Sequence, residues 1–197
     1  VCHLNEGHAA FAVVARAAAH ARRTGSRFAV GLRAVRAGMI FSTHTPVSAA
    51  FDRYPASLVE RFGGPAMRAL DVDPTRVLAL GRPHDDPDGF ETAHLLIRGA
   101  GHVNGVSRLH GRISRRLFAP LFPRVPLCEV PIGHVTNGVD TRTWTGPAAA
   151  SLWREVAPDG PLAPWRADGA AASIDLAGVS DARLWAMRTE ARRRLVE

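Results

Sequence analysis

The sequence contains no lysine. All 25 basic residues of the 197-residue chain are arginines. No residue of this chain can therefore form a Schiff base through a lysine side chain, which excludes that kind of covalent catalysis. Arginine used throughout is typical of a GC-rich genome, and acidic residues are mixed among the arginines. The net charge of +7 therefore does not indicate a nucleic-acid surface, which would show clustered basic residues with aromatic residues between them.

Long apolar runs and cysteines are also scarce. No stretch of about 18 apolar residues occurs, so we expect no membrane-spanning helix. The first residues, Val1-Cys2-His3, do not form the apolar region of a signal peptide, and we expect a cytoplasmic location. Cys2 and Cys128 lie far apart without a CxxC partner, which argues against a disulfide framework or a zinc site.

Motifs for metals and phosphates are missing as well. The histidines lack an HExxH spacing, so we expect no catalytic metal. "GAGHVNG" (99–105) is not GxGxxG, and no P-loop lysine exists, so a phosphate-binding loop is unsupported. The chain begins without methionine and its last residues, "ARRRLVE", have the pattern of a helix, so we expect an internal piece of a longer protein.

What remains is the composition of a globular protein, with 46% hydrophobic and 22% charged residues. A helix is predicted from an N-cap at Asn5 to about Arg23, with Gly25 as its stop. The apolar run 38–43 predicts a strand. "PASLVERFGGPAMRAL" (55–70) predicts one or two short helices broken at "GGP".

The second half continues this alternation. Residues 82–89 are a polar loop, and 90–118 contain two helices separated by 99–105. "CEVPIGHVTNGVD" (128–140) predicts a short strand and a loop. The Pro-, Gly- and Ala-rich segment from Thr145 predicts a connector before a last helix over 180–197. Helices alternating with short strands predict an α/β fold, in which ligands bind at the carboxyl ends of the strands.

Four polar clusters combine His, Asn, Thr or Glu with glycine. They are "HLNEGH" (3–8), "STHTP" (42–46), "HVNGVSRLHG" (102–111) and "GHVTNGVD" (133–140). Neutral donors and acceptors of this kind suit the hydroxyl groups of a sugar. Glu6 or Glu60 with Asp140 could supply the two carboxylates of a glycosidase, but the spacing singles out no pair. From local chemistry alone, structural and functional roles stay equally open for His8, His44 and Asn137.

Together, "HLNEGHAAF", "FSTHTPVSAAFDRYP", "NGVSRLHGRISRRLF" and "PIGHVTNGVDTRTW" resemble motifs of the α-glucan phosphorylases, the glycogen, starch and maltodextrin phosphorylases. The resemblance spans nearly all of the chain. It implies an α/β fold that is part of two facing Rossmann-like domains, the GT-B arrangement. Residues 1–144 would end the N-terminal domain, and 145–197 would form the crossover and the first helix of the C-terminal domain.

The resemblance also implies the chemistry. The family transfers a glucosyl unit from the non-reducing end of an α-1,4-glucan to orthophosphate and releases glucose 1-phosphate, assisted by pyridoxal phosphate. His44 and Asn137 resemble the catalytic-site residues that hold the transferred glucose. Four more residues resemble further substrate contacts. The full substrate-binding set implied by the resemblance is Glu6, His8, His44, Thr45, Val106 and Asn137.

The cofactor lysine of the family lies outside the matching part, so we expect no cofactor-binding residue here and no activity from this chain alone. Glucan or maltodextrin and orthophosphate are the expected partners, without nucleic acid or membrane, and a homo-oligomer of the longer protein stays open. Ser48, Ala50, Arg112 and Asp140 depart from the family pattern. Two rival interpretations remain, a nucleotide-sugar glucan synthase of the same fold and a non-catalytic glucan-binding remnant, with a glycosidase as a more distant third.

Overall fold

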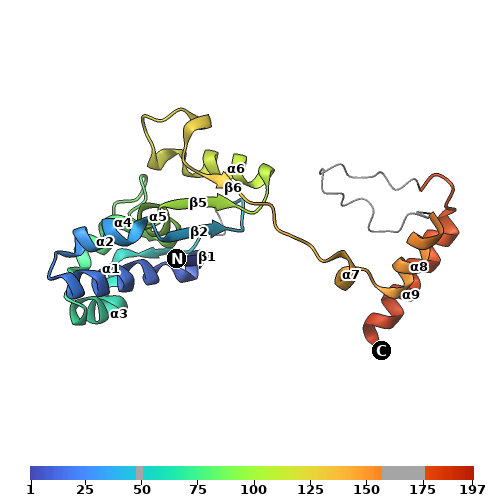
Figure 1. Ribbon diagram of the computed structural model, residues 1–197, viewed down its shortest axis with the longest axis horizontal. Coiled ribbons are helices and arrows are strands. Elements are labelled where there is room, and N and C mark those ends of the chain that lie inside the picture. The colour runs from blue at the N-terminus through green and yellow to red at the C-terminus, as the bar shows by residue number, and fades with distance from the viewer. Residues whose placement is uncertain (48–50, 157–175) are drawn as a thin grey trace. The chain divides into compact units, whose positions relative to one another are not determined.

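The structure is a computed structural model that describes residues 1–47, 51–156 and 176–197 (Figure 1). The chain divides into two compact units, Val1–Asn137 and Gly138–Glu197. The boundary expected between residues 144 and 145 on the strength of the family resemblance stays a prediction.

A four-stranded parallel sheet lies at the centre of the first unit (Figure 1). Its strands follow chain order across the sheet: β1 (Cys2–Asn5), β2 (Met39–Thr43), β5 (His102–Gly105) and β6 (Gly133–His134). In register, Leu4 lies opposite Phe41, and Phe41 opposite Val103. The predicted α/β class is confirmed, and because the strands are parallel, the residues after each one emerge at the same edge.

Two helices connect β1 to β2. A short 3₁₀ turn, η1 (Gly7–Ala9), precedes α1 (Phe11–Thr24) and α2 (Phe28–Arg36). The predicted stop at Gly25 is confirmed, because this residue has a φ of 64°, the left-handed conformation that glycine adopts without steric penalty. The predicted N-cap at Asn5 is wrong. Asn5 ends strand β1, and the helical backbone begins only after Glu6.

The connection from β2 to β5 is the longest. It contains β3 (Arg53–Pro55), α3 (Ala56–Ala69), α4 (Pro74–Gly81), β4 (Gly89–Glu91) and α5 (Thr92–Gly99). Strands β3 and β4 form a separate antiparallel ribbon. The predicted break at "GGP" is wrong, since α3 runs through Pro65. Val59 and Met67 on its inner face are buried in the core, and this packing outweighs the low helix propensity of Gly63, Gly64 and Pro65.

Helix α6 (Arg108–Phe118) connects β5 to β6, followed by the 3₁₀ turns η3 (Ala119–Leu121) and η4 (Leu127–Glu129). The two helices expected within 90–118 are confirmed as α5 and α6. The segment between them, however, contains strand β5 rather than only a break. Strand β6 is only two residues long.

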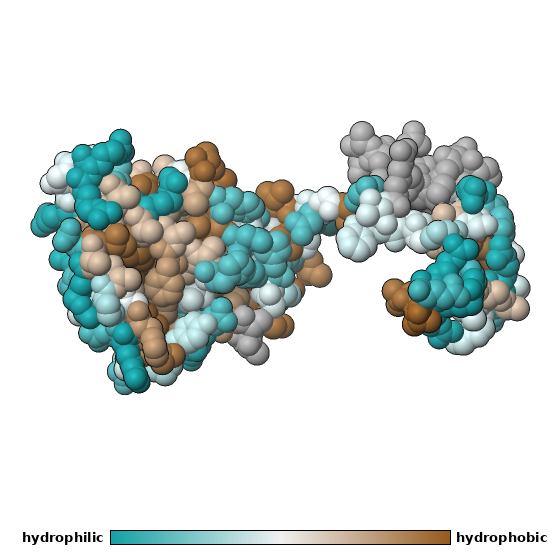
Figure 2. Space-filling model, turned by 90° about the horizontal axis from the view of Figure 1, so that it is seen from below, coloured by the Kyte–Doolittle hydropathy of each residue, from teal (hydrophilic) through white to brown (hydrophobic). Residues whose placement is uncertain are grey.

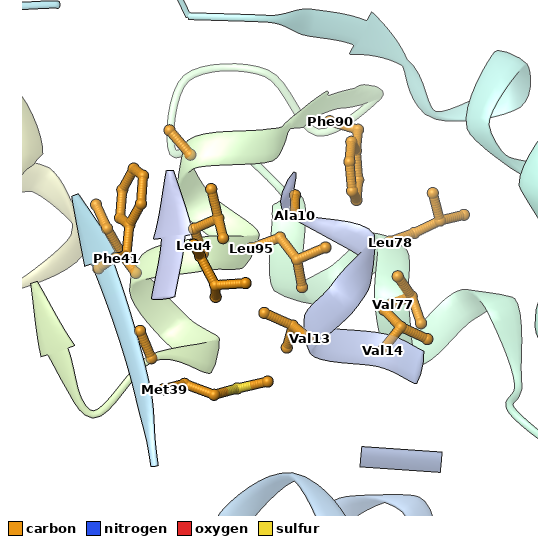
Figure 3. Close-up of a cluster of buried hydrophobic side chains, with 14 of the residues drawn as sticks. Leu4, Ala10, Val13, Val14, Met39, Phe41, Val77, Leu78, Phe90 and Leu95 are labelled. Carbon is orange, nitrogen blue, oxygen red and sulfur yellow. The ribbon is translucent and has the colours of Figure 1, made fainter. Parts of the chain in front are cut away.

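One face of the sheet carries the apolar core. Leu4, Met39 and Phe41 lie in one buried cluster with Val13 of α1 and Leu95 of α5 (Figure 3), and each of the three is at most 1% exposed. The opposite face is polar. His3 Nε2 lies 2.7 Å from Ser42 Oγ, which donates to Asn104 Oδ1 at 3.2 Å, so hydrogen bonds join side chains of β1, β2 and β5.

Some apolar residues reach the surface of the first unit. Phe11, Leu58 and Phe62 line a groove of about 680 Å³ between α1 and α3. Figure 2, seen from below, shows apolar surface in brown among polar residues on this unit.

Among the described residues, no helix is both long and apolar enough to cross a membrane. Cys2 and Cys128 are free thiols, as expected.

The second unit contains α7 (Thr141–Trp144), α8 (Pro147–Val156) and α9 (Asp181–Val196). The last predicted helix is confirmed as α9, which Ser180 caps by accepting a hydrogen bond from the Arg183 N–H at 3.3 Å. The connector predicted from Thr145 is wrong in its first part, where α8 forms, and residues 157–175 lie outside the described part. An ion pair of 2.5 Å between Arg183 and Glu155 joins α9 to α8.

Candidate functional site

The polar clusters found in the sequence meet at the carboxyl edge of the sheet. Glu6 follows β1, His44 follows β2, Val106 follows β5, and Asn137 lies three residues beyond β6. In register, Asn5 is opposite Ser42, and Thr43 is opposite Gly105. Residues distant in the sequence thus emerge from neighbouring strands, in the place where open α/β sheets bind ligands.

Glu6 joins the first two loops of this edge. Its N–H donates to the Ser42 carbonyl at 3.0 Å. Its carboxylate Oε1 accepts hydrogen bonds from the His44 backbone N–H and from Thr45 Oγ1, the latter at 3.3 Å. Glu6 has a φ of 63° and a ψ of 177°, a conformation that residues other than glycine adopt at an energetic cost. A strained residue held by its neighbours at a strand end is a common feature of functional sites.

Val106 and Asn137 join the last two loops. The Asn137 N–H donates to the Val106 carbonyl at 3.1 Å, and the Val135 N–H donates to the Gly105 carbonyl at 3.0 Å. These bonds continue the pairing of β5 and β6 beyond the strands. The backbone of Asn137 is therefore fixed, although the residue is exposed.

His44 and Asn137 present exposed polar side chains at this edge. Within the described part of the chain, neither side chain has a hydrogen-bonding partner. The imidazole and the amide are therefore available to a ligand, and both can donate and accept hydrogen bonds.

His8 lies in η1, next to a hollow of about 190 Å³ that Glu6 and Thr45 also line. Three further residues line it that the sequence analysis did not select: Phe51, Asp52 and Thr92. Thr92 Oγ1 is buried without a partner among the described residues. A Cβ at Gly7 would lie 2.6 Å from this hydroxyl, so the glycine permits the close approach.

Only two of these three additional residues could have been found from the sequence. Phe51 and Asp52 directly follow the "STHTP" cluster, within a stretch already quoted as a motif. Thr92 begins α5, and no local pattern marks it. Only the packing of α5 beside η1 brings it to the hollow.

The structure thus joins Glu6, His44 and Thr45 by hydrogen bonds, and Val106 with Asn137 by another. The β2–β5 pairing places the two groups on neighbouring strands. Of the possible glycosidase carboxylates, only Glu6 is placed at this edge within the first unit. Glu60 is exposed on α3 and does not line the hollow, and Asp140 lies in the second unit.

Two of the four departures from the family pattern, Arg112 and Asp140, lie among the described residues. Arg112 is exposed on α6, and Asp140 accepts a hydrogen bond from Thr143 Oγ1 at 2.7 Å. Ser48 and Ala50 lie outside the described residues. None of these positions lines the 190 Å³ hollow in the described part of the chain.

The chemistry of the edge suits a neutral, hydroxyl-rich ligand. Histidine, threonine and asparagine dominate it, and within the described part of the chain no group of three or more His, Cys, Asp or Glu side chains could hold a metal ion. The chain has no lysine to hold pyridoxal phosphate as a Schiff base. Its residues therefore do not fit covalent binding of that cofactor.

Comparison with known proteins bears directly on this site. The chain is 40% identical over 206 aligned residues to a glycogen phosphorylase of Mycobacterium tuberculosis, and this match includes 100% of the chain. The chain is therefore a homologue of the α-glucan phosphorylases. It is also 41% identical over 144 residues to a maltodextrin phosphorylase of Thermococcus litoralis, covering 73% of the chain. A glycogen phosphorylase of Aquifex aeolicus is 31% identical over 154 residues, which include 78% of the chain.

The chain spans only 23%, 17% and 22% of the lengths of these three phosphorylases. No family model matches it. The resemblance drawn from the four motifs is confirmed, and in this phosphorylase homologue all four motifs contribute residues to one edge of the sheet.

Proposed function

We propose that the protein containing this chain is an α-glucan phosphorylase. It transfers a glucosyl unit from the non-reducing end of an α-1,4-glucan, such as glycogen or maltodextrin, to orthophosphate and releases glucose 1-phosphate. Similarity to phosphorylases along the whole chain carries this proposal. The arrangement of polar loops at the carboxyl edge of the sheet supports it.

The chain contributes part of the pocket that binds the sugar. The exposed His44 imidazole and Asn137 amide hydrogen-bond hydroxyl groups of the glucosyl unit, while Glu6, His8 and Thr45 line the adjacent hollow. These contacts hold the pyranose in place while positive charge develops at its anomeric carbon. The Val106 carbonyl already accepts from Asn137, and its second lone pair stays available to the sugar.

The remaining parts of the proposal concern the longer protein. Its fold is two facing Rossmann-like domains, with residues 1–144 in the first and 145–197 leading into the second. It uses pyridoxal phosphate, held by residues that this chain does not contain, and it works in the cytoplasm. The isolated chain is inactive because it holds neither the cofactor nor the complete pocket.

The test uses the complete protein with maltoheptaose and inorganic phosphate. We expect glucose 1-phosphate to form only when phosphate is present. Glucose release without phosphate would instead identify a glycosidase, and chain elongation from a nucleotide sugar would identify a synthase. Absence of all three products from a folded, cofactor-loaded protein would favour a non-catalytic remnant.

His44→Ala tests the role of the imidazole. We expect kcat/KM for phosphorolysis to fall about 100-fold or more, because the sugar loses an orienting contact near the reacting carbon. Cofactor content and the thermal midpoint should stay unchanged, since His44 is exposed. His84→Ala, an exposed histidine of the polar loop 82–89, is the matched control and should keep normal turnover. Equal turnover in His44→Ala and the unaltered protein would refute the assignment.

A further inference from the structure

We propose that His110 is a positioning residue of the sugar site, which fixes the backbone of Val106 and, through it, Asn137. This inference rests on the proposed function, because Asn137 is assigned there to the sugar. His110 is not one of the residues proposed to contact the sugar. It is 6% exposed and lies in the first turn of α6.

Two hydrogen bonds place the imidazole. The His110 N–H donates to Ser107 Oγ at 3.1 Å, which caps the helix. The side chain turns back, and Nδ1 accepts the N–H of Val106 at 3.0 Å. A capping box has the same form, with a Glu or Gln side chain three residues after the cap reaching back to an unpaired N–H. Here an imidazole does so, one residue further back.

Val106 is consequently held from both sides. Its N–H is bonded to His110, and its carbonyl accepts the Asn137 N–H at 3.1 Å. The N–H belongs to the 105–106 peptide and the carbonyl to the 106–107 peptide, so the two hydrogen bonds fix the peptide planes on both sides of the Val106 Cα. A relay of two hydrogen bonds therefore connects the buried imidazole to the backbone of the exposed asparagine.

Helix α6 packs closely against the ends of β5 and β6. A Cβ at Gly105 would lie 2.9 Å from His110 Nδ1, and a Cβ at Gly111 would lie 2.8 Å from the Gly133 carbonyl. Both glycines let α6 approach the ends of β5 and β6 closely. Helix, strand end and imidazole thus form one rigid unit beneath the site.

The position of the proton on the His110 ring distinguishes a positioning role from a role in packing alone. Since Nδ1 accepts, the proton lies on Nε2, which is buried without a partner among the described residues. A buried donor without a partner destabilises a fold, and a leucine would fill similar space without that penalty. What the imidazole supplies beyond a leucine is the acceptor for Val106.

Ser114, one turn further along the same helix, offers a matched control. It is 1% exposed, and its Oγ is also buried without a partner among the described residues. No hydrogen bond connects its side chain to the Val106 loop. Ser114→Ala therefore changes a buried polar group of α6 without touching the relay.

The test compares His110→Leu, His110→Asn and Ser114→Ala in the complete protein. His110→Leu should increase hydrogen exchange in the peptides containing Val106 and Asn137, and should lower kcat/KM for maltoheptaose phosphorolysis about tenfold. In His110→Asn, Oδ1 can replace Nδ1 as the acceptor, so this variant should retain most of the protection from hydrogen exchange and most of kcat/KM. Ser114→Ala should leave exchange in these peptides and turnover unchanged.

Three results would overturn the relay. The first is an equal effect of His110→Leu and Ser114→Ala on exchange and turnover, and the second is no rescue by His110→Asn. The third is a ¹⁵N spectrum of the histidine-labelled 197-residue chain that places the His110 proton on Nδ1. Because this spectrum uses the unaltered sequence, it tests the relay even if His110→Leu fails to fold. If the unaltered protein makes no glucose 1-phosphate, the proposed function fails, while the exchange comparison still tests the relay.

Discussion

The apolar face of the sheet and its carboxyl edge are built from the same strands, yet they differ in every physical respect. On the face, Leu4, Met39 and Phe41 are at most 1% exposed. At the edge, His44 is exposed and Glu6 has a left-handed backbone. Inside the sheet, backbone pairing and apolar packing stabilise the strands. Beyond the last ladder hydrogen bond, side chains are free to serve a ligand, so stability and function occupy neighbouring parts of one element.

The largest expected effect tests the face. Phe41→Ala should lower the free energy of unfolding by about 3–5 kcal/mol, because it removes a fully buried ring and leaves a cavity. Phe62→Ala is the matched control, since the same change at a ring that is 69% exposed should alter the free energy by less than about 0.5 kcal/mol. Chemical denaturation measures both. Similar losses in the two variants would contradict the assignment of the core to this face.

The second prediction tests the carboxyl edge of the sheet through Glu6. Glu6→Ala and Glu6→Gly both remove the carboxylate that holds the His44 loop, so both should lower turnover in the complete protein to a similar degree. Their stabilities should differ. Glycine tolerates the φ of 63° and alanine does not, so Glu6→Gly should be more stable by about 1–2 kcal/mol.

Denaturation curves and phosphorolysis rates of the two Glu6 variants provide the comparison. Equal stabilities would show that residue 6 is not held in the left-handed region. Normal turnover in Glu6→Gly would show that the carboxylate is dispensable for the edge.

The smallest expected effect is a pH dependence of stability that arises from His94, a histidine that is largely buried. The side chain of His94, on α5, is 12% exposed and lies 3.1 Å from Glu91. Burial lowers the pKa of His94, and this outweighs the opposite influence of Glu91. Because the folded pKa lies below the value of 6.5 in the unfolded chain, the unfolded state binds the proton first as the pH falls. Stability should therefore decrease below about pH 6.5.

This contribution cannot exceed about 1.4 kcal/mol per pH unit, the slope for one proton. Urea denaturation at pH 7 and pH 5.5 measures it. His94→Gln should reduce the difference in the free energy of unfolding between the two pH values. A larger difference in His94→Gln would give the opposite sign and contradict the burial effect.

Local chemistry made several features predictable. Gly25 ends α1 because its backbone adopts a left-handed conformation, and the helices expected at the end of 90–118 and over 180–197 are α6 and α9. Strand β1 was missed because "CHLN" has a single fully buried residue, Leu4. Its extended form depends on pairing with β2, which is distant in the sequence. Likewise α3 continues through Pro65 because the core holds both of its halves.

The sequence by itself determined the kind of ligand group and its place on the chain. Neutral hydrogen-bonding residues after short apolar segments are a local property, and their order along the chain carries the similarity to phosphorylases. Only the tertiary structure decided which groups meet. The register of parallel strands brings Glu6 to the His44 loop, α5 places Thr92 at the hollow, and α6 puts the His110 imidazole behind Val106. Such contacts between distant residues depend on long-range packing, which no local pattern encodes.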